Sequence, residues 1–244
     1  MSTPATNKQI VLEAFETLFN KRDYAKAARF WSPRYIQHSA HIEPGREGLF
    51  NLVKSLPSTL RYENAVVAVD GDFVLLHGRF SGSGLPMFGT SFASREEQAG
   101  PSDAQSGLSP EEARAMVAPL YDALNRPAQK DVAALLARAC NPDYKSYSTN
   151  EDWLNRDQLA EVFKAIGAAV PDLRWTIQDV LTVRDQIIVR GEASGTPTGD
   201  LWGTKPTGKS FKTLSIDVFS VQGGKLASAY HVENWVGALQ QIGK

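Results

Sequence analysis

Residues 210–235 read SFKTLSIDVFSVQGGKLASAYHVENW, and this stretch decides the fold class. Residues 210–221 are rich in β-branched and aromatic side chains, which is typical of a β-strand, and we interpret residues 225–235 as a second strand. Between them, Gln222-Gly223-Gly224 supplies the glycine that a tight hairpin turn needs. The stretch therefore predicts a β-hairpin that closes a sheet.

Helices and strands alternate irregularly upstream of this hairpin. Ser109, Pro110 and Glu112 predict a helix start with a capping box, and apolar residues then recur at helical spacing up to Leu124. Further helices are predicted over 132–139 and from Arg156, and long strands follow around 174–183 and 190–195. This order predicts an α+β fold and not an alternating βαβ fold.

The first part of the chain repeats this order. Asn20 ends its first helix as Asn125 ends the later one, Arg61-Tyr62 matches Arg174-Trp175, and His77-Gly78 matches Arg190-Gly191. No second hairpin follows, so we expect the last strand of this copy at 73–81. We predict an incomplete unit at 6–93, a linker at 94–107 and a complete unit at 108–244.

An open sheet edge in the incomplete unit would need a cover. Strand edges without neighbours expose backbone donors and acceptors and promote aggregation. We therefore expect the complete unit or a partner chain to cover this edge, through intramolecular pairing of the units or a homodimer. In this hypothesis the first copy serves as an assembly module.

Composition limits the possible partners. The 244 residues contain 26 Lys and Arg against 27 Asp and Glu, so there is no basic surplus for binding nucleic acid. A single cysteine, Cys140, excludes an internal disulfide. The N-terminus predicts neither a signal peptide nor a membrane span, so we expect no membrane partner and a cytoplasmic location.

Several short motifs resemble one family. Asp23-Tyr24 with Trp31 and Gly45-Arg-Glu-Gly48 look like its opening; Ile216-Asp-Val-Phe219, His231-Val-Glu-Asn-Trp235 and Gly237-Ala-Leu-Gln-Gln241 look like its closing hairpin and tail. On these motifs the chain resembles the SnoaL-like polyketide cyclase group of the nuclear transport factor 2-like superfamily. Ser83-Gly-Leu-Pro-Met-Phe-Gly89 also resembles a tail of this family. The resemblance implies a cone-shaped, curved mixed β-sheet packed on three helices (a cystatin-like roll), in one complete and one incomplete copy.

The resemblance also implies a function. SnoaL-like cyclases bind small hydrophobic, carbonyl-containing molecules in a conical pocket and use a carboxylate base to start an aldol-type ring closure. Such chemistry, or a related isomerisation, needs a carboxylate and donors for the enolate oxygen, and no metal or organic cofactor. His38, His41 and His77 lack acidic residues at ligand spacing, so we expect no metal site.

Four polar residues near the end of the chain are candidates for catalysis. The acidic position of the family tail falls on Asn234, and its histidine position is kept as His231. Glu233 shares a strand face with His231, and Asp217 lies in the preceding strand. We interpret Asp217 or Glu233 as the base and His231 or Asn234 as the orienting group. The alternatives are a polar cluster at the mouth of the cone for His231 and Glu233, and a solvent-facing position for Asp217.

Aromatic side chains complete the expected site. A flat ligand suits aromatic walls, so the substrate-binding candidates are Tyr121, Tyr147, Trp153, Trp202 and Phe219. Because asparagine cannot act as a base, a second hypothesis remains: a non-catalytic ligand-binding or assembly protein that has lost its acid.

Overall fold

The structure is a computed structural model that describes residues 4–36, 42–70, 73–82, 87–94, 107–148, 152–183 and 185–243. The chain divides into two compact units, Met1–Gln105 and Ser106–Lys244. The division falls within the predicted linker, but residues 95–106 lie outside the described residues, so the linker itself stays a prediction. No helix among the described residues is long and apolar enough to cross a lipid bilayer.

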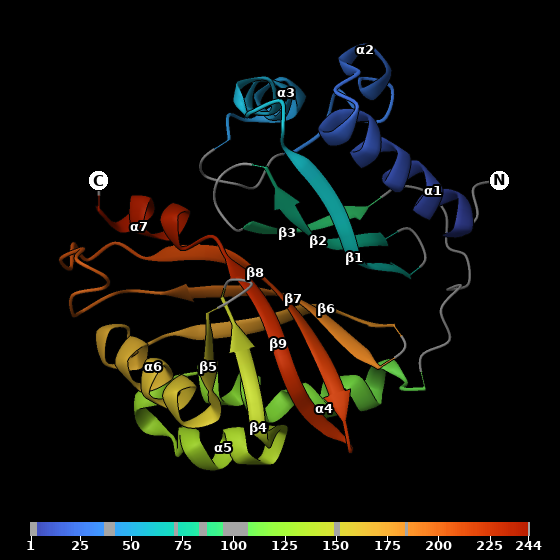
Figure 1. The fold of residues 1–244 in the computed structure, drawn as a ribbon. Helices are drawn as coiled ribbons and strands as arrows, with labels where there is room; N and C mark the ends of the chain where they lie inside the picture. The colour runs from blue at the N-terminus through green and yellow to red at the C-terminus, as the bar shows by residue number, and fades with distance from the viewer. Residues whose placement is uncertain are drawn as a thin grey trace. The chain divides into compact units, whose positions relative to one another are not determined.

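The second unit is built on a curved, mixed six-stranded sheet (Figure 1). Its strands lie in the order β5-β4-β9-β8-β7-β6, and β4 runs parallel to β9 while the other neighbours are antiparallel. The order of helices and strands predicts this α+β class, and the family resemblance implies the curved mixed sheet. The strands are β4 Cys140–Tyr147, β5 Trp153–Asn155, β6 Arg174–Val183, β7 Gln186–Gly195, β8 Phe211–Gln222 and β9 Lys225–Glu233.

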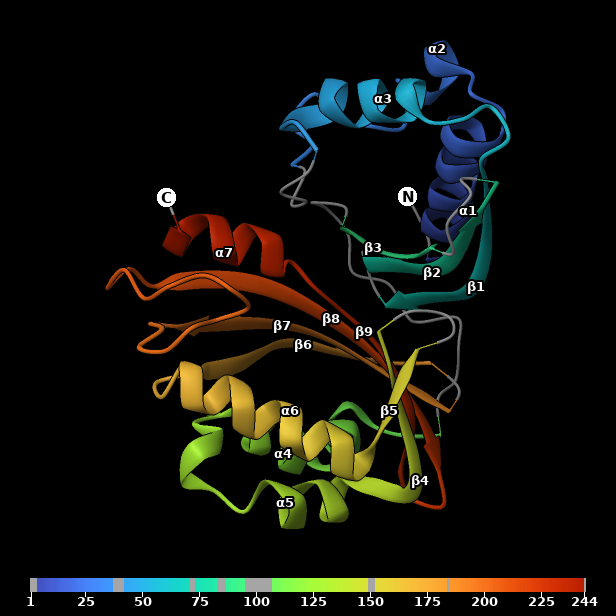
Figure 2. The same ribbon diagram turned by 60° about the vertical axis from the view of Figure 1, so that its left-hand side comes forward.

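Three helices, α4 Pro110–Leu124, α5 Val132–Ala139 and α6 Arg156–Ala169, cover one face of this sheet (Figure 2). The predicted capping box at the start of α4 is present: the Ser109 side chain accepts from the Glu112 amide, and Glu112 accepts from the Ser109 amide. Asn155 and Gln158 form a second capping box before α6. A 3₁₀ turn, η2 Pro127–Gln129, joins α4 to α5, and α7 Trp235–Gly243 ends the chain.

The predicted hairpin joins β8 to β9. Gly223 and Gly224 have φ of 61° and 75°, the left-handed region that a two-residue hairpin turn of this kind needs. The strand that we expected to run to Trp235 ends earlier, at Glu233. Asn234 then begins a helix, because its side-chain oxygen accepts a hydrogen bond from the Gly237 amide, 3.0 Å away.

The first unit has a smaller, three-stranded antiparallel sheet in the order β1-β2-β3. Its strands are β1 Arg61–Asp70, β2 Phe73–Ser81 and β3 Met87–Ser94; its helices are α1 Pro4–Phe15, the π-helical turn η1 Glu16–Asn20, α2 Tyr24–Ala27 and α3 Gly45–Ser55. Two expectations were wrong: a further strand follows Ser81, and Met87–Gly89 pairs with β2 instead of forming a tail. The hairpin that follows β7 in the second unit is therefore represented by one strand here.

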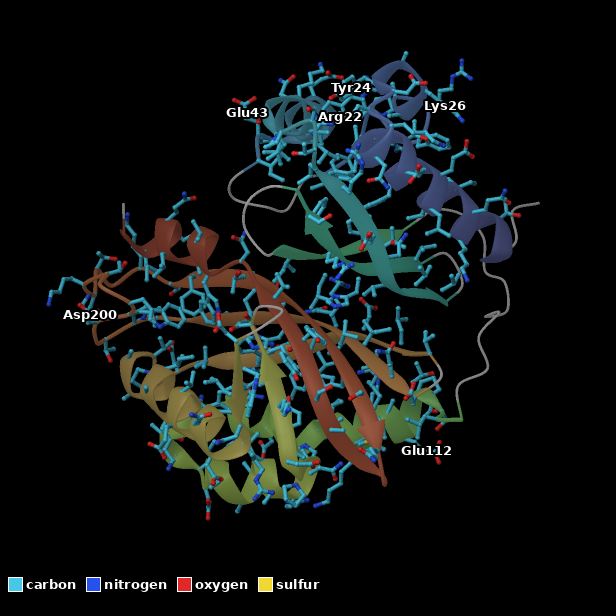
Figure 3. All side chains as sticks on the ribbon, in the orientation of Figure 1. Arg22, Tyr24, Lys26, Glu43, Glu112 and Asp200 are labelled. Atoms are coloured by element: carbon cyan, nitrogen blue, oxygen red, sulfur yellow. The ribbon has the colours of Figure 1, made fainter. Side chains whose placement is uncertain are left out.

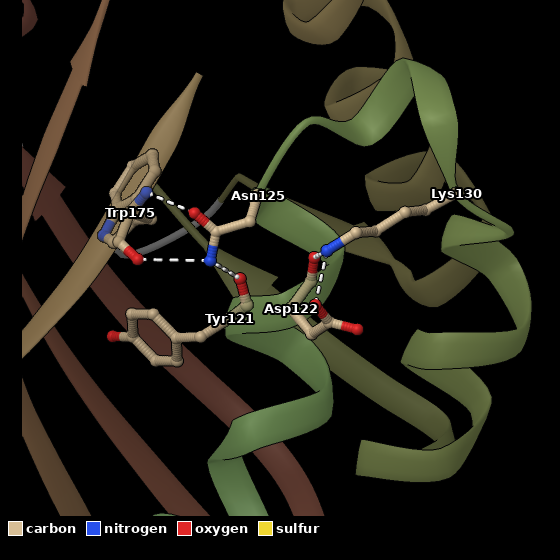
Figure 4. A network of polar contacts seen from close by, with 5 residues as sticks. All are labelled: Tyr121, Asp122, Asn125, Lys130 and Trp175. Atoms are coloured by element: carbon tan, nitrogen blue, oxygen red, sulfur yellow. Dashed lines mark hydrogen bonds and ion pairs between the residues drawn. The ribbon is translucent and has the colours of Figure 1, made fainter. Parts of the chain in front are cut away.

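An asparagine clamp occurs in both units and supports the repeat. In the second unit, the Trp175 amide donates to the Asn125 side chain at 2.7 Å, and that side chain donates to the Trp175 carbonyl at 3.2 Å (Figure 4). In the first unit, Asn20 and Tyr62 make the same two bonds at 2.8 and 3.0 Å. Each clamp ties the end of the first helix to the first long strand of its unit.

The two sheets share a further irregularity. The β1–β2 register shifts between Asn64 and Val66, and the β6–β7 register shifts between Ile177 and Asp179. Each β-bulge begins two residues after the clamped aromatic residue, where it sharpens the bend of the strand. The two copies therefore match residue by residue in the half of the sheet that both possess.

Each unit has its own hydrophobic core. The largest fully buried side chains of the second core include Tyr144, Leu136, Leu173 and Leu226. The core of the first unit is rich in rings, with Phe15, Phe19, Trp31, Tyr62 and Phe80 within 4.9–6.2 Å of a neighbouring ring. Cys140 is a buried free thiol, and burial raises its pKa to about 12.

Candidate functional site

A buried carboxyl group lies between α4 and the sheet of the second unit. Asp217 projects from β8 and is 9% exposed, and the Tyr121 hydroxyl on α4 donates to its Oδ2 at 2.6 Å. Asp217 therefore points to the helix-covered face, and the solvent-facing alternative is wrong. The pattern of β8 explains this, because Ser215, Asp217 and Phe219 alternate with the less buried Leu214 and Ile216.

A second donor chain approaches Asp217 along the sheet. The indole Nε1 of Trp175 on β6 donates to the Ser215 hydroxyl at 3.0 Å, within the buried interior. Ser215 lies two residues before Asp217 on the same buried face of β8, and its hydroxyl lowers the pKa of the Asp217 carboxyl group. Gly191 on β7 makes room, since a Cβ there would lie 2.6 Å from the Ser215 oxygen and 2.9 Å from the Trp175 nitrogen.

His231 and Glu233 form an ion pair on the same face. His231 lies directly opposite Asp217 in the β8–β9 register, and Glu233 lies opposite Ser215. The imidazole Nδ1 is 3.0 and 3.2 Å from the two carboxylate oxygens of Glu233. Paired residues in a sheet project to the same side, so the four side chains form one polar cluster.

Burial and charge shift the proton affinities of this cluster. Burial, and then the negative charge of Glu233, raise the pKa of Asp217 to about 7. Burial alone would lower the pKa of His231, but the charge and hydrogen bond of Glu233, together with the charge of Asp217, outweigh burial and raise the pKa to about 9. Near neutral pH the cluster therefore holds a charged imidazolium beside a carboxyl group that can gain or lose a proton.

The cluster is not sealed from solvent at its outer end. The side chains of His231 and Glu233 are 24% and 13% exposed, whereas Asp217 is nearly covered. Burial and the charge of Asp217 raise the pKa of Tyr121, so this phenol stays protonated and acts as a donor. A small molecule that reached His231 would meet one cationic donor and one carboxyl group.

Asn234 lies between the end of β9 and the start of α7. Its side chain accepts from the Gly237 amide, and its own amide donates to the Leu214 carbonyl at 3.2 Å. The position that corresponds to the family acid therefore fixes the start of α7. An orienting role for Asn234 stays a prediction.

The aromatic candidates separate into three groups. Tyr121 and Phe219 belong to the buried core on the face of Asp217. Tyr147 and Trp153 lie on the other face, where Tyr147 stacks on Tyr230 with ring centroids 4.7 Å apart. Because Tyr230 and His231 are neighbours in β9, their side chains point to opposite sides of the sheet. The structure thus does not bring Tyr147 or Trp153 to Asp217.

Trp202 forms the third group, at an exposed turn. It is 53% exposed, has φ of 49°, and lies edge-on to Trp235 with centroids 4.7 Å apart. The ring centroids of Trp235 and Trp175 are in turn 6.1 Å apart. Asp200, at the outer side of this turn (Figure 3), accepts a hydrogen bond from the Gly203 amide. Trp202 is therefore connected to the polar cluster through two other indoles, not directly.

Sequence reasoning missed Ser215 and the polar role of Trp175. The indole N–H of Trp175 has a defined acceptor 40 residues later in the chain. The sequence did hold a signal for Ser215: side chains alternate between the two faces of a strand, so Ser215 shares a face with Asp217, two residues later. No local sequence pattern indicates that the indole N–H of Trp175 on β6 reaches Ser215.

Other sites in the described residues offer little chemistry. Among them no group of three or more His, Cys, Asp or Glu side chains has an arrangement that could hold a metal ion. His38 and His41 lie outside the described residues, and His77 is buried in the first unit. A shallow hollow over α1 and η1 is lined by Lys8, Gln9, Leu12, Glu13, Glu16 and Lys21, far along the chain from the polar cluster.

Comparisons with known proteins agree with this fold. The family model of the SnoaL-like polyketide cyclases matches residues 115–242, and that of the SnoaL-like domain matches residues 11–102. No curated protein matches the chain.

Solved structures resemble part of the chain. A proposed SnoaL-like polyketide cyclase from Jannaschia sp. CCS1 is 16% identical; the match covers 57% of this chain and 98% of that one, with a TM-score of 0.50. IdmH, a proposed polyketide cyclase from Streptomyces antibioticus, is 23% identical over 53% of this chain and 96% of that one, with a TM-score of 0.47. TsrD from Streptomyces laurentii is 19% identical; the match covers 56% of this chain and 98% of that one, with a TM-score of 0.49.

One family model spans more than half of the 244 residues and a second matches the other unit. The chain therefore belongs to the SnoaL-like polyketide cyclase family, within the nuclear transport factor 2-like superfamily, and carries two SnoaL-like units in tandem.

Proposed function

We propose that the second unit binds a small hydrophobic ketone and moves a proton on the carbon next to its carbonyl group, as a cyclase or isomerase does. The observation that carries this proposal is the placement of Asp217 opposite His231 on one covered face, each beside its own partner, Tyr121 or Glu233. Cyclisation and isomerisation both begin with this proton transfer, so the proposal does not depend on the identity of the substrate.

Asp217 is the base in this proposal. Its ionised carboxylate removes the proton from the α-carbon, and the C–H electrons move into an enolate. The raised pKa, about 7, is near the range in which general bases are most effective at neutral pH. Glu233 is less suited to this role, because both of its carboxylate oxygens face the His231 imidazole.

His231 stabilises the enolate. Its Nδ1–H is held by Glu233, which leaves the Nε2–H of the imidazolium to donate to the enolate oxygen. In an isomerisation, the proton on Asp217 returns to another carbon. In a cyclisation, the enolate carbon attacks a second carbonyl of the same molecule, and the new alkoxide takes a proton from His231. The proton that Asp217 gained then passes to His231, which restores both groups. The side chains supply every proton in these steps, without a cofactor.

Proton exchange on a model ketone tests the proposal. We would incubate the full chain with 2-tetralone in D2O and follow loss of the α-proton signal by NMR. The wild-type chain should accelerate exchange, and Asp217→Asn should reduce the acceleration by about 10²–10⁴-fold. Asp143→Asn, an exposed carboxylate on β4, is the matched control and should retain full exchange. Loss of exchange in Glu233→Gln with retention in Asp217→Asn would assign the base to Glu233 instead.

A second function has its own supporting observation. The family's acidic position holds Asn234, whose side chain caps α7 and so serves the fold. This favours a protein that binds the same class of ligand without turnover. Quenching of tryptophan fluorescence by 2-tetralone, with no exchange above the uncatalysed rate, would support this binding protein and overturn the enzyme.

A further inference from the structure

We propose that Trp175 and Ser215 form a one-way hydrogen-bond relay that orients the Asp217 carboxyl group, and that the second unit has this relay while the first unit lacks it. The proposal deepens the proposed function and relies on it only for naming Asp217 as the base. Both relay members are positioning residues, since they act through Asp217.

The direction of the relay follows from the chemistry of its members. An indole N–H can donate but cannot accept, so the Ser215 oxygen must accept from Trp175. The Ser215 proton is then free to point at Asp217, two residues further along the same buried face of β8. The Tyr121 hydroxyl on α4 donates to Oδ2, so the proposed relay adds a second donor, from β8, to the same carboxyl group.

The first unit supplies an internal comparison. Tyr62 occupies the place of Trp175, because both are clamped by an asparagine and both lie two residues before a bulge. Gly78 corresponds to Gly191: the strand partner of Gly191 is Ser215, whereas that of Gly78 is Gly89. The first unit therefore has glycine where the second has the relay serine.

The consequence is visible at the Tyr62 phenol. Tyr62 is 5% exposed, and its hydroxyl has no hydrogen-bond partner in the part of the chain that the structure describes. A Cβ on Gly78 would lie 2.8 Å from this oxygen, as one on Gly191 would crowd the Trp175 nitrogen. The same scaffold thus forms without the relay, which argues that the relay serves the carboxyl group and not the fold.

Other ionisable groups also face Asp217, so the relay accounts for only part of the shift in its pKa. Tyr121 projects from α4, Tyr144 from β4, and His231 and Glu233 from β9. Glu233 raises the pKa of Asp217, while His231, Tyr121 and Ser215 lower it. Removing Ser215 deletes one stabilising donor and leaves the others in place.

The test is a titration of Asp217 in the full chain. The carboxyl carbon would be labelled with ¹³C, assigned by its loss in Asp217→Asn, and followed by NMR from pH 4 to 10. Ser215→Ala should raise the midpoint by about 0.5–1 pH unit, and Trp175→Phe should raise it by a smaller amount. Tyr62→Phe, the matched change in the first unit, should leave it unchanged.

Each outcome decides the proposal. An unchanged midpoint in Ser215→Ala overturns the relay, and so does an equal change in Tyr62→Phe. If Trp175→Phe fails to fold, Ser215→Ala decides alone, because it removes a single oxygen atom. The titration needs no turnover, so the relay can be confirmed even if 2-tetralone is not a substrate. Where exchange is measurable, its lower pH limb should move with the NMR midpoint.

Discussion

Asp217 on β8 and His231 on β9 are direct partners in the antiparallel register, and their side chains emerge on the face that α4 covers. Their ionic states are coupled, because the positive imidazolium lowers the pKa of Asp217 and the carboxylate raises that of His231. The pair therefore defines a pH range in which one partner is a carboxylate and the other is still an acid.

This range predicts a bell-shaped pH dependence of proton exchange. The rate should rise as Asp217 ionises near pH 7 and fall as His231 loses its proton near pH 9. Rates of 2-tetralone exchange from pH 5 to 10 would measure both limbs. His231→Asn should lose the upper limb while retaining the lower one, and a wild-type profile that is flat from pH 6 to 10 would contradict the assignment of both groups.

The same shift predicts that Asp217 weakens the fold at high pH. The pKa of Asp217 is higher in the folded chain than its ordinary value of 3.8, so the folded state binds the extra proton between about pH 4 and 7, and stability falls as pH rises through this range. Asp217→Asn removes this dependence. Its advantage over wild type in free energy of unfolding should grow by about 1–2 kcal/mol between pH 5.5 and 8.5. Urea unfolding at pH 5.5 and 8.5 would measure these free energies. Asp143→Asn, at an exposed position, is the control, and its free energy of unfolding should differ from that of wild type by the same amount at both pH values.

The asparagine clamps predict separate effects in the two units. Asn125→Ala should destabilise the second unit by about 1–3 kcal/mol, because the Trp175 amide and carbonyl lose their partner. Asn20→Ala should do the same to the first unit through Tyr62. Hydrogen exchange read by mass spectrometry would resolve the units. Faster exchange confined to the substituted unit supports two independent clamps, and equal acceleration in both units contradicts them.

The hairpin turn predicts a contrast between two substitutions. Gly223 and Gly224 both have positive φ, so Gly224→Val should destabilise the chain by about 1–2 kcal/mol. Gly223→Asn should be nearly neutral, since asparagine is common at this position of such turns. Thermal unfolding would compare them. A harmless Gly224→Val would show that the turn does not set the register that places Asp217 opposite His231.

The open edge of the first unit predicts self-association of its fragment. β3 forms one end of the three-stranded sheet as the structure describes it, so its outer backbone groups have no strand neighbour there. A fragment of residues 1–105 should form dimers or larger species, while 106–244 should stay folded around its own core. Size-exclusion chromatography with light scattering would measure both. A monomeric, folded 1–105 fragment would end the hypothesis that this unit is an assembly module.

Local patterns were enough to predict much of this fold. The capping box at Ser109, the Gly223-Gly224 turn and the repeated order of helices and strands all depend on neighbours in sequence. β3 was missed because its sequence, Met-Phe-Gly-Thr-Ser-Phe-Ala-Ser, was compared with a family tail, and strand formation there depends on pairing with β2. Asn234 was placed in a strand because a helix cap and a strand end differ only in the residues that follow.

For the site, the sequence predicted only which side chains share a strand face, from the alternation of side chains along each strand. Alternation placed Asp217, His231 and Glu233 on strand faces, but which face turns to the helices depends on Tyr121, 96 residues before Asp217. The Trp175–Ser215 contact likewise spans 40 residues and two strands. Such contacts follow from the curvature of the sheet, which no short window of sequence contains.

The difference between a six-stranded and a three-stranded sheet also limits how the first unit could evolve. Replacing Gly89 with serine and Tyr62 with tryptophan would imitate the buried donors, but in the described residues this unit has no counterpart of β9 to carry an imidazole and its carboxylate. Substitutions within the three strands could not supply this pair. A counterpart of Asp217 and His231 would require the insertion of a further strand beside β3.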